Sequence, residues 1–140
     1  MSAVLRAYGD SFDVDAFLAD CTLPVIAVKR RGEPVLPASQ PNGRRLEQSG
    51  VHVSASDADF DEFPRQVAEA TEFLRAEAEQ VRRLCQFPGV EGVTLDFGIA
   101  RRDAVVQCDY LPPELVRLAG SLGLGIELSQ YPALGDAQDS

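Results

Sequence analysis

Four side chains of this sequence have the chemistry to hold a metal ion or to transfer protons: His52, Asp96, Asp109 and Glu127. Each lies at a polar position of a segment in which apolar and polar residues alternate, so all four are expected on one face of a β-sheet. Such a set could bind a divalent cation or do acid–base work if its strands are neighbours. The alternative, which we favour, is an ordinary solvated sheet face.

A second acidic run, Asp57, Asp59 and Asp61, has the spacing of the first ligands of a calcium loop. The rest of that motif is missing, because Glu62 stands where the turn needs glycine and Ala68 where it needs a bidentate acid. The run is therefore expected to form the acidic start of a helix. The sequence predicts no metal site and no cofactor.

Nucleophilic catalysis has little support in the sequence. His52 is the single histidine, and no Ser or Cys lies in a recognisable nucleophile motif. Spacing therefore identifies no catalytic triad, and we expect a protein that is not an enzyme.

Composition limits the partners of the chain. Its 140 residues, 45% of them hydrophobic, suit one globular domain with one core. A net charge of −9 opposes binding to nucleic acid and to anionic membranes. No apolar stretch is long enough to span a bilayer, and the first residues lack the pattern of a secretory signal, so a cytoplasmic location is expected.

Basic residues gather around one long loop rich in Gly and Pro, residues 32–50. Four arginines flank or lie in it: Arg30, Arg31, Arg44 and Arg45. Their planar guanidinium groups could bind a phosphate or a carboxylate. The alternative is that they are solubilising charges on a mobile loop.

Acidic residues suggest a different partner. Glu69, Glu72 and Glu79 lie off the apolar stripe of the longest predicted helix, and with Asp96 and Asp109 they could form a patch complementary to a basic protein. A solvated helix face is the commoner explanation of such residues. The patch is nevertheless the strongest interaction feature that the sequence offers.

Periodicity predicts an α+β fold, with residues 1–131 as one domain and 132–140 as a flexible tail. The expected order is β-α-β-β-α-β, as in ferredoxin-like folds, extended by β-α-β, in a mostly antiparallel sheet with helices on one face. Strand order is not readable from the sequence. The expected strands are 2–8, 25–28, 51–55, 93–99, 106–110 and 126–130, and the expected helices are 13–21, 61–84 and 113–122.

Two of these segments, 3–28 and 104–129, show the same strand–helix–strand pattern, and 106–110 is expected to form a hairpin with 93–99. The opening Ala7-Tyr8-Gly9-Asp10-Ser11-Phe12-Asp13-Val14-Asp15, Pro24 and the segment Lys29-Arg30-Arg31-Gly32-Glu33 resemble a family of small uncharacterised bacterial domains. Some small acidic proteins of this kind resemble immunity proteins that neutralise a toxin. The resemblance implies no catalytic residues.

Together these features favour a non-enzymatic protein-binding domain whose partner is a basic protein such as a toxin. The alternative is a domain that binds a small ligand or anion through the Arg-rich loop. The sequence leaves the partner, the oligomeric state and any role of His52 open.

Overall fold

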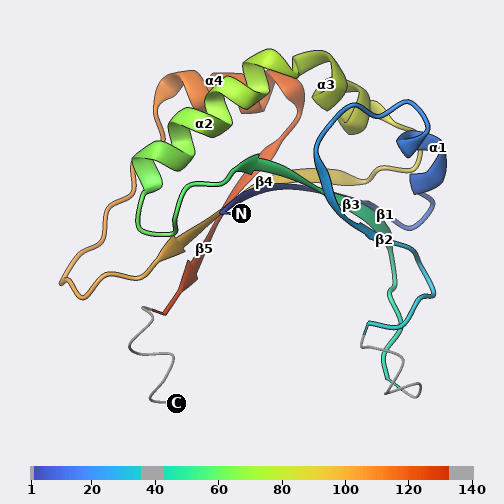
Figure 1. Ribbon diagram of the computed structural model, residues 1–140, viewed down its shortest axis with the longest axis horizontal. Coiled ribbons are helices and arrows are strands. Elements are labelled where there is room, and N and C mark those ends of the chain that lie inside the picture. The colour runs from blue at the N-terminus through green and yellow to red at the C-terminus, as the bar shows by residue number, and fades with distance from the viewer. Residues whose placement is uncertain (1, 36–42, 133–140) are drawn as a thin grey trace.

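The computed structural model describes residues 2–35 and 43–132. The described part is an α+β fold of five strands and four helices (Figure 1). In chain order the elements are β1 (Ala3–Gly9), α1 (Val14–Leu18), β2 (Val25–Lys29), β3 (Ser49–Ser56), α2 (Phe63–Ala76), α3 (Ala78–Gln86), β4 (Gly92–Ala100), α4 (Pro113–Leu122) and β5 (Gly125–Tyr131).

One mostly antiparallel sheet organises the molecule, in the strand order β2-β3-β1-β4-β5. Its central strand β1 is antiparallel to both β3 and β4, and β5 alone is added parallel, beside β4. Ala3, Leu5 and Ala7 of β1 are fully buried, whereas Arg6 between them is only partly buried. The two-residue period of the strand therefore separates a core side from an open side.

Helices α2, α3 and α4 lie above the sheet in Figure 1, and α1 lies at its right-hand end. Their apolar residues pack on the core side of the strands, with Leu74, Leu84 and Leu115 among the side chains that have no exposed surface. Buried Gln66 ties α2 to the sheet, since its amide donates to the carbonyls of Asp59 and Gly98, each at 2.9 Å. The opposite side of the sheet is concave in this view.

Helix starts follow the sequence expectations in outline, but α1 ends at Leu18 and not at residue 21. The prediction that the run Asp57, Asp59 and Asp61 forms the acidic start of a helix was wrong, because α2 begins at Phe63 and has no acid in its first turn. Asp13 caps α1 by accepting a hydrogen bond from the backbone N–H of Ala16 at 3.1 Å, Pro64 lies in the first turn of α2, and Gly123 ends α4 with φ of 89°. The long helix predicted over 61–84 is instead two helices, because the backbone of Glu77 leaves the helical region (φ −111°, ψ 24°).

The predicted hairpin was wrong, and of the strand–helix–strand pattern assigned to 104–129 only the helix and the second strand are present. Residues 101–112 form no strand, and the side chains of Val105, Val106 and Tyr110 are strongly exposed. The physical reason is that β1 and β5 occupy both edges of β4. No edge is left for a hairpin partner, although 104–110 alternates like a strand.

Two expectations fall partly outside the described residues. The predicted tail, 132–140, is described only at Pro132, and the predicted long loop lacks 36–42. On either side of that gap, Pro34 and Arg45 form an antiparallel bridge, which continues the β2–β3 connection away from the sheet. None of the helices in the described part combines the length and the apolarity needed to cross a membrane.

The turn before β4 gives a direct test of the fold. Gly89 has φ of +88°, and a Cβ there would lie 2.2 Å from the carbonyl oxygen of Ser11. We expect Gly89→Ala to lower the free energy of unfolding by more than about 2 kcal/mol in urea denaturation, from backbone strain and the clash. Gly120→Ala in α4 is the control: its Cβ would meet nothing within 4 Å, so it should stabilise by up to about 1 kcal/mol. Equal effects would contradict the turn geometry.

Candidate functional site

The open side of the sheet and the β2–β3 connection together form a hollow of about 700 Å³, a volume typical of ligand sites. We call it the sheet groove. Its floor is the open side of all five strands, and its wall is the chain from Arg44 to Gln48. Its lining includes the side chains of Arg6, Tyr8, Lys29, Arg45, His52 and Glu127.

Arg6 lies at the centre of the groove floor and joins two carboxylates. Its Nη2 is 2.9 Å from Oδ2 of Asp96 and 2.5 Å from Oε2 of Glu127, on the next two strands. Asp96 also accepts a hydrogen bond of 2.6 Å from the hydroxyl of Ser129. The side chain of Asp96 is only 11% exposed. Because its charge is largely removed from water, it needs the guanidinium of Arg6 as a partner.

His52 lies directly across the β1–β3 ladder from Arg6, and Ala27 of β2 is its neighbour on the other side. Burial lowers the pKa of this half-buried imidazole below its usual 6.5, and the charges of Lys29 and Arg6 lower it further, against a smaller opposing effect of Asp96. The imidazole thus senses a positive potential. This is notable in a chain whose net charge is −9.

Charge is unevenly distributed in the groove. The side near β4 and β5 carries Asp96 and Glu127, whose charges are engaged by Arg6. The side near β2 and the connection carries Lys29, Arg44 and Arg45 against the acid Glu47. The β2 side of the groove is therefore locally basic, whereas the ring of Tyr8 on the floor lies over Gly92 of β4.

Of the four side chains proposed for metal or acid–base chemistry, the structure brings three to the groove side of the sheet and separates one. His52, Asp96 and Glu127 share that side, but the guanidinium of Arg6 occupies the place between the two carboxylates where a cation would be held. Asp109 lies in the irregular segment after β4, where Arg102 and Gln107 contact its carboxylate at 3.2 and 3.0 Å.

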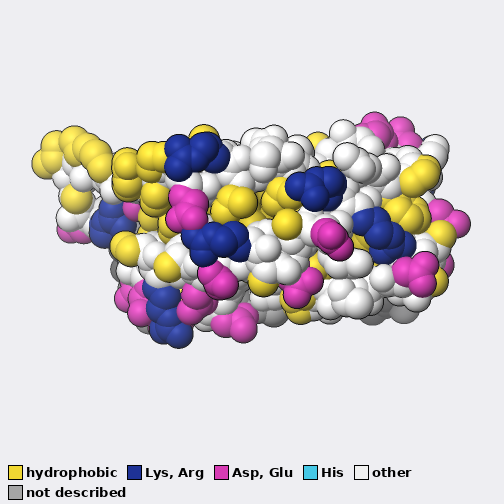
Figure 2. All heavy atoms as spheres, turned by 90° about the horizontal axis from the view of Figure 1, so that it is seen from above, with side chains coloured by type: hydrophobic (Ala, Val, Ile, Leu, Met, Phe, Trp, Pro, Cys, Tyr) yellow, Lys and Arg dark blue, Asp and Glu magenta, His cyan; other side chains and the backbone are white. Residues whose placement is uncertain are grey.

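The five acidic residues assigned to a basic partner are distributed over different parts of the molecule. Glu69 accepts hydrogen bonds from Ser56 and Arg65, at 2.7 and 2.9 Å, and both lower its pKa. Glu72 pairs with Arg75 at 2.7 Å, and Glu79 is exposed on α3. Figure 2 shows acidic and basic side chains interspersed over the helix layer. Asp96 lies on the far side of the sheet, and the Asp109 side chain is only 6% exposed.

The four arginines divide into two pairs. Arg30 pairs with Asp15 of α1 at 2.7 Å, which lowers the pKa of that carboxyl, and Arg31 donates to the carbonyl of Asp10 at 3.4 Å. Arg44 and Arg45 line the groove, where Arg45 also donates to the carbonyl of Gly32 at 2.9 Å. Only the second pair can meet a ligand on the sheet.

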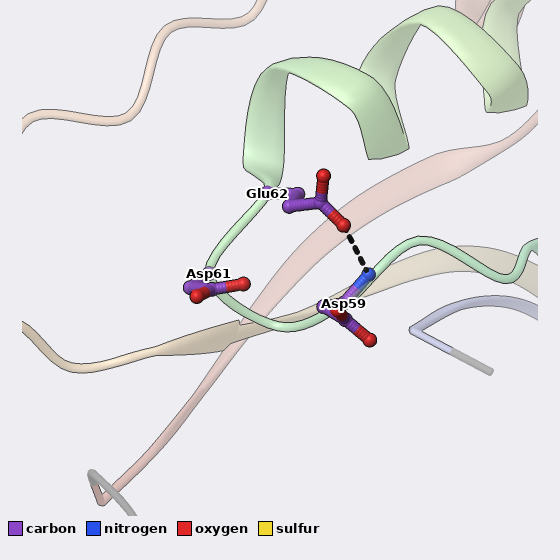
Figure 3. Close-up of side chains that lie close together, drawn as sticks. All are labelled: Asp59, Asp61 and Glu62. Atoms are coloured by element: carbon purple, nitrogen blue, oxygen red, sulfur yellow. Dashed lines mark hydrogen bonds between the residues drawn. The ribbon is translucent and has the colours of Figure 1, made fainter.

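Within residues 2–35 and 43–132, one acidic group has the spacing to hold a metal ion: Asp59, Asp61 and Glu62 (Figure 3). One of its three carboxylates has an ordinary structural use. Glu62 accepts a hydrogen bond of 3.3 Å from the backbone N–H of Asp59 and so closes the turn that leads into α2. Asp57, the remaining acid of the calcium-like run, instead accepts a hydrogen bond from Ser54 at 3.4 Å.

Sequence reasoning missed Arg6, Tyr8 and Lys29, which complete the groove. The signal was present for the first two, because both alternate with buried residues of β1. Lys29 lies one residue beyond the expected strand 25–28, whereas in the structure it is the last residue of β2 and faces Gly50 across the β2–β3 ladder. Strand order was required to see that these residues meet His52.

Arg6 should stabilise the fold through Asp96. We expect Arg6→Ala to lower the free energy of unfolding by about 1–3 kcal/mol, because it leaves the nearly buried carboxylate of Asp96 without its cation. Because Arg6 itself is 39% exposed, this loss of stability should be smaller than for a fully buried pair. In the Asp96→Asn background the same change should cost clearly less, as urea titrations would measure. Glu72→Ala, which breaks an exposed pair, should cost less than about 0.5 kcal/mol.

The single histidine allows a clean pH experiment. We expect the His52 C–H signals to titrate by NMR with a midpoint below 6.5, and Lys29→Gln to raise it, since a repelling charge is removed. The imidazole then takes up a proton less readily in the folded protein than in the unfolded chain. Its contribution to the free energy of unfolding is therefore present above about pH 6.5 and is lost as pH falls through the midpoint of the folded protein. Lys29→Arg is the control; a wild-type midpoint above 6.5 would contradict the groove potential.

No protein-family model matches the chain, and searches of curated proteins and of solved structures found no match. The resemblance noted from the sequence therefore stays a prediction. The groove has to be interpreted from its own geometry.

Proposed function

We propose that this protein is a non-enzymatic binding domain whose sheet groove takes a small anionic ligand, with Lys29, Arg44 and Arg45 supplying the positive charge. The single observation that carries this proposal is a basic, ligand-sized hollow on a strongly acidic chain. Self-repulsion and solubility explain charges spread over a surface, but they do not explain basic residues gathered in a concavity.

Binding rather than catalysis is supported by the state of the acidic groups. Asp96 and Glu127 are held as hydrogen-bond acceptors by Arg6, and Asp96 by Ser129 as well. These contacts engage both oxygens of Asp96 and one oxygen of Glu127 within the sheet itself. Burial and the nearby charges of Lys29 and Arg6 lower the pKa of His52, which favours its neutral form in the free groove.

The fold supports a binding role in a second way. The order and directions of β1 to β4 agree with a ferredoxin-like core, to which we assign the first six elements of the predicted order, with α4 and β5 as an extension. We assign the helices to one face of the sheet, which leaves the opposite face free for a ligand.

The basic protein partner predicted from the sequence, a toxin for example, remains a prediction. The acids proposed for it do not share one surface, and Glu69 and Glu72 are already paired with arginines of their own helix. Exposed pairs of this kind are weak, so a partner could displace them, but nothing in their placement favours one. The groove is the better-supported site.

Titration with inorganic phosphate and with citrate at low salt tests the proposal. We expect both to raise the melting temperature, to shift the His52 NMR signals, and to raise the His52 midpoint, because a bound anion favours the imidazolium. Binding should weaken as salt is added. Lys29→Gln should weaken it by about tenfold, equivalent to ~1.4 kcal/mol.

Arg117→Gln on α4 is the matched control, since it removes the same charge from an exposed position outside the groove. It should leave the affinity within about twofold, a change of less than about 0.5 kcal/mol. His52 signals that stay unchanged with both anions at low salt would contradict the proposal. Equal losses in the two variants would mean that the anions respond to overall charge and not to the groove.

A further inference from the structure

The two edges of the sheet differ in their protection against pairing with another strand. β2 is short, follows Pro24, ends on Lys29 and has a register irregularity between Val25 and Ala27. These are features that block edge pairing. β5 runs for seven residues without a proline or lysine and pairs in continuous register with β4 from Gly125 to Tyr131. Its outer edge has no strand partner in the described part of the chain.

The backbone groups on that outer edge can be assigned. The N–H of Arg101 donates to the carbonyl of Tyr131 at 2.8 Å, so Tyr131 directs its backbone groups toward β4. Because direction alternates along a strand, Glu127 and Ser129 also face β4, whereas Ile126, Leu128 and Gln130 direct their N–H and C=O groups outward. Leu128 is the midpoint of this outward set.

This outward set is complementary to itself. If two copies of β5 pair antiparallel about Leu128, Leu128 opposes Leu128, and Ile126 opposes Gln130 in hydrogen-bonded pairs. On the groove side, Glu127 opposes Ser129, and Gly125 opposes Tyr131. No like charges meet in this pairing.

We propose that β5 is a self-association edge, through which two copies of this chain form a two-fold symmetric dimer with one continuous ten-stranded sheet. Leu128, which is 38% exposed on that edge, would be covered. The edge is smaller than a standard interface and each chain carries a charge of −9, so the affinity should be micromolar and should increase with salt.

Sedimentation equilibrium over a range of concentrations, at low and high salt, tests the proposal. We expect a monomer–dimer equilibrium that shifts toward dimer at high salt, which is opposite to the salt response expected for phosphate in the groove. Leu128→Lys should weaken the dimer by about tenfold or more, since two ammonium groups would meet at the two-fold axis. Leu128→Pro should do the same, because it removes an outward N–H and leaves the β4 ladder intact.

Ile26→Lys is the matched control on the other edge, because Ile26 and Leu128 are 39% and 38% exposed. It should leave the dimer unchanged. Melting temperatures and NMR spectra would establish that the variants are folded. A monomer at every concentration and salt overturns the proposal, as does a dimer that Ile26→Lys disrupts and the Leu128 variants do not. Phosphate binding by the Leu128→Lys monomer would leave the groove proposal standing independently.

Discussion

The alternation of β1 is the constraint on which the rest of the structure depends. β1 lies between β3 and β4, so its register fixes the side to which both neighbours direct their apolar residues. A slip of one residue would move Leu5 to the open side and Arg6 into the core. Such a slip is disfavoured because it would bury a charge among apolar side chains. With the register fixed, Arg6 lies on the open side of the sheet, where Asp96 and Glu127 pair with it.

That placement gives the open side of the sheet two chemically different halves. Toward β5, the carboxylates and Arg6 satisfy one another, and this half stabilises the sheet by bridging β1, β4 and β5. Toward β2, basic side chains lie around His52, whose pKa burial and their charges lower, without a comparable set of acids. The half that we propose for ligand binding therefore lies beside the half that holds the sheet together, so changes at Arg6 and at Lys29 should have different consequences.

Much of the fold could be predicted from local patterns, and the errors share one cause. The apolar stripe of α4, Leu115, Ala119 and Leu122, is buried as its spacing indicates, and the strand around Val51 and Val53 is where alternation places it. The segment 104–110 alternates equally well, yet it forms no strand because β4 already has two neighbours. Alternation reports how a strand would bury its side chains, but it does not report whether an edge is available.

The sequence by itself determined the α+β class, the approximate starts of α1, α2 and α4, and the membership of His52, Asp96 and Glu127 in a polar face, since these depend on residues near one another in the chain. Tertiary structure alone decided that Asp109 lies apart and that Lys29 and Arg45 meet the sheet face. Such contacts depend on strand order and on the path of the β2–β3 connection. Both are set by packing between distant segments, for which a single sequence carries no local signal.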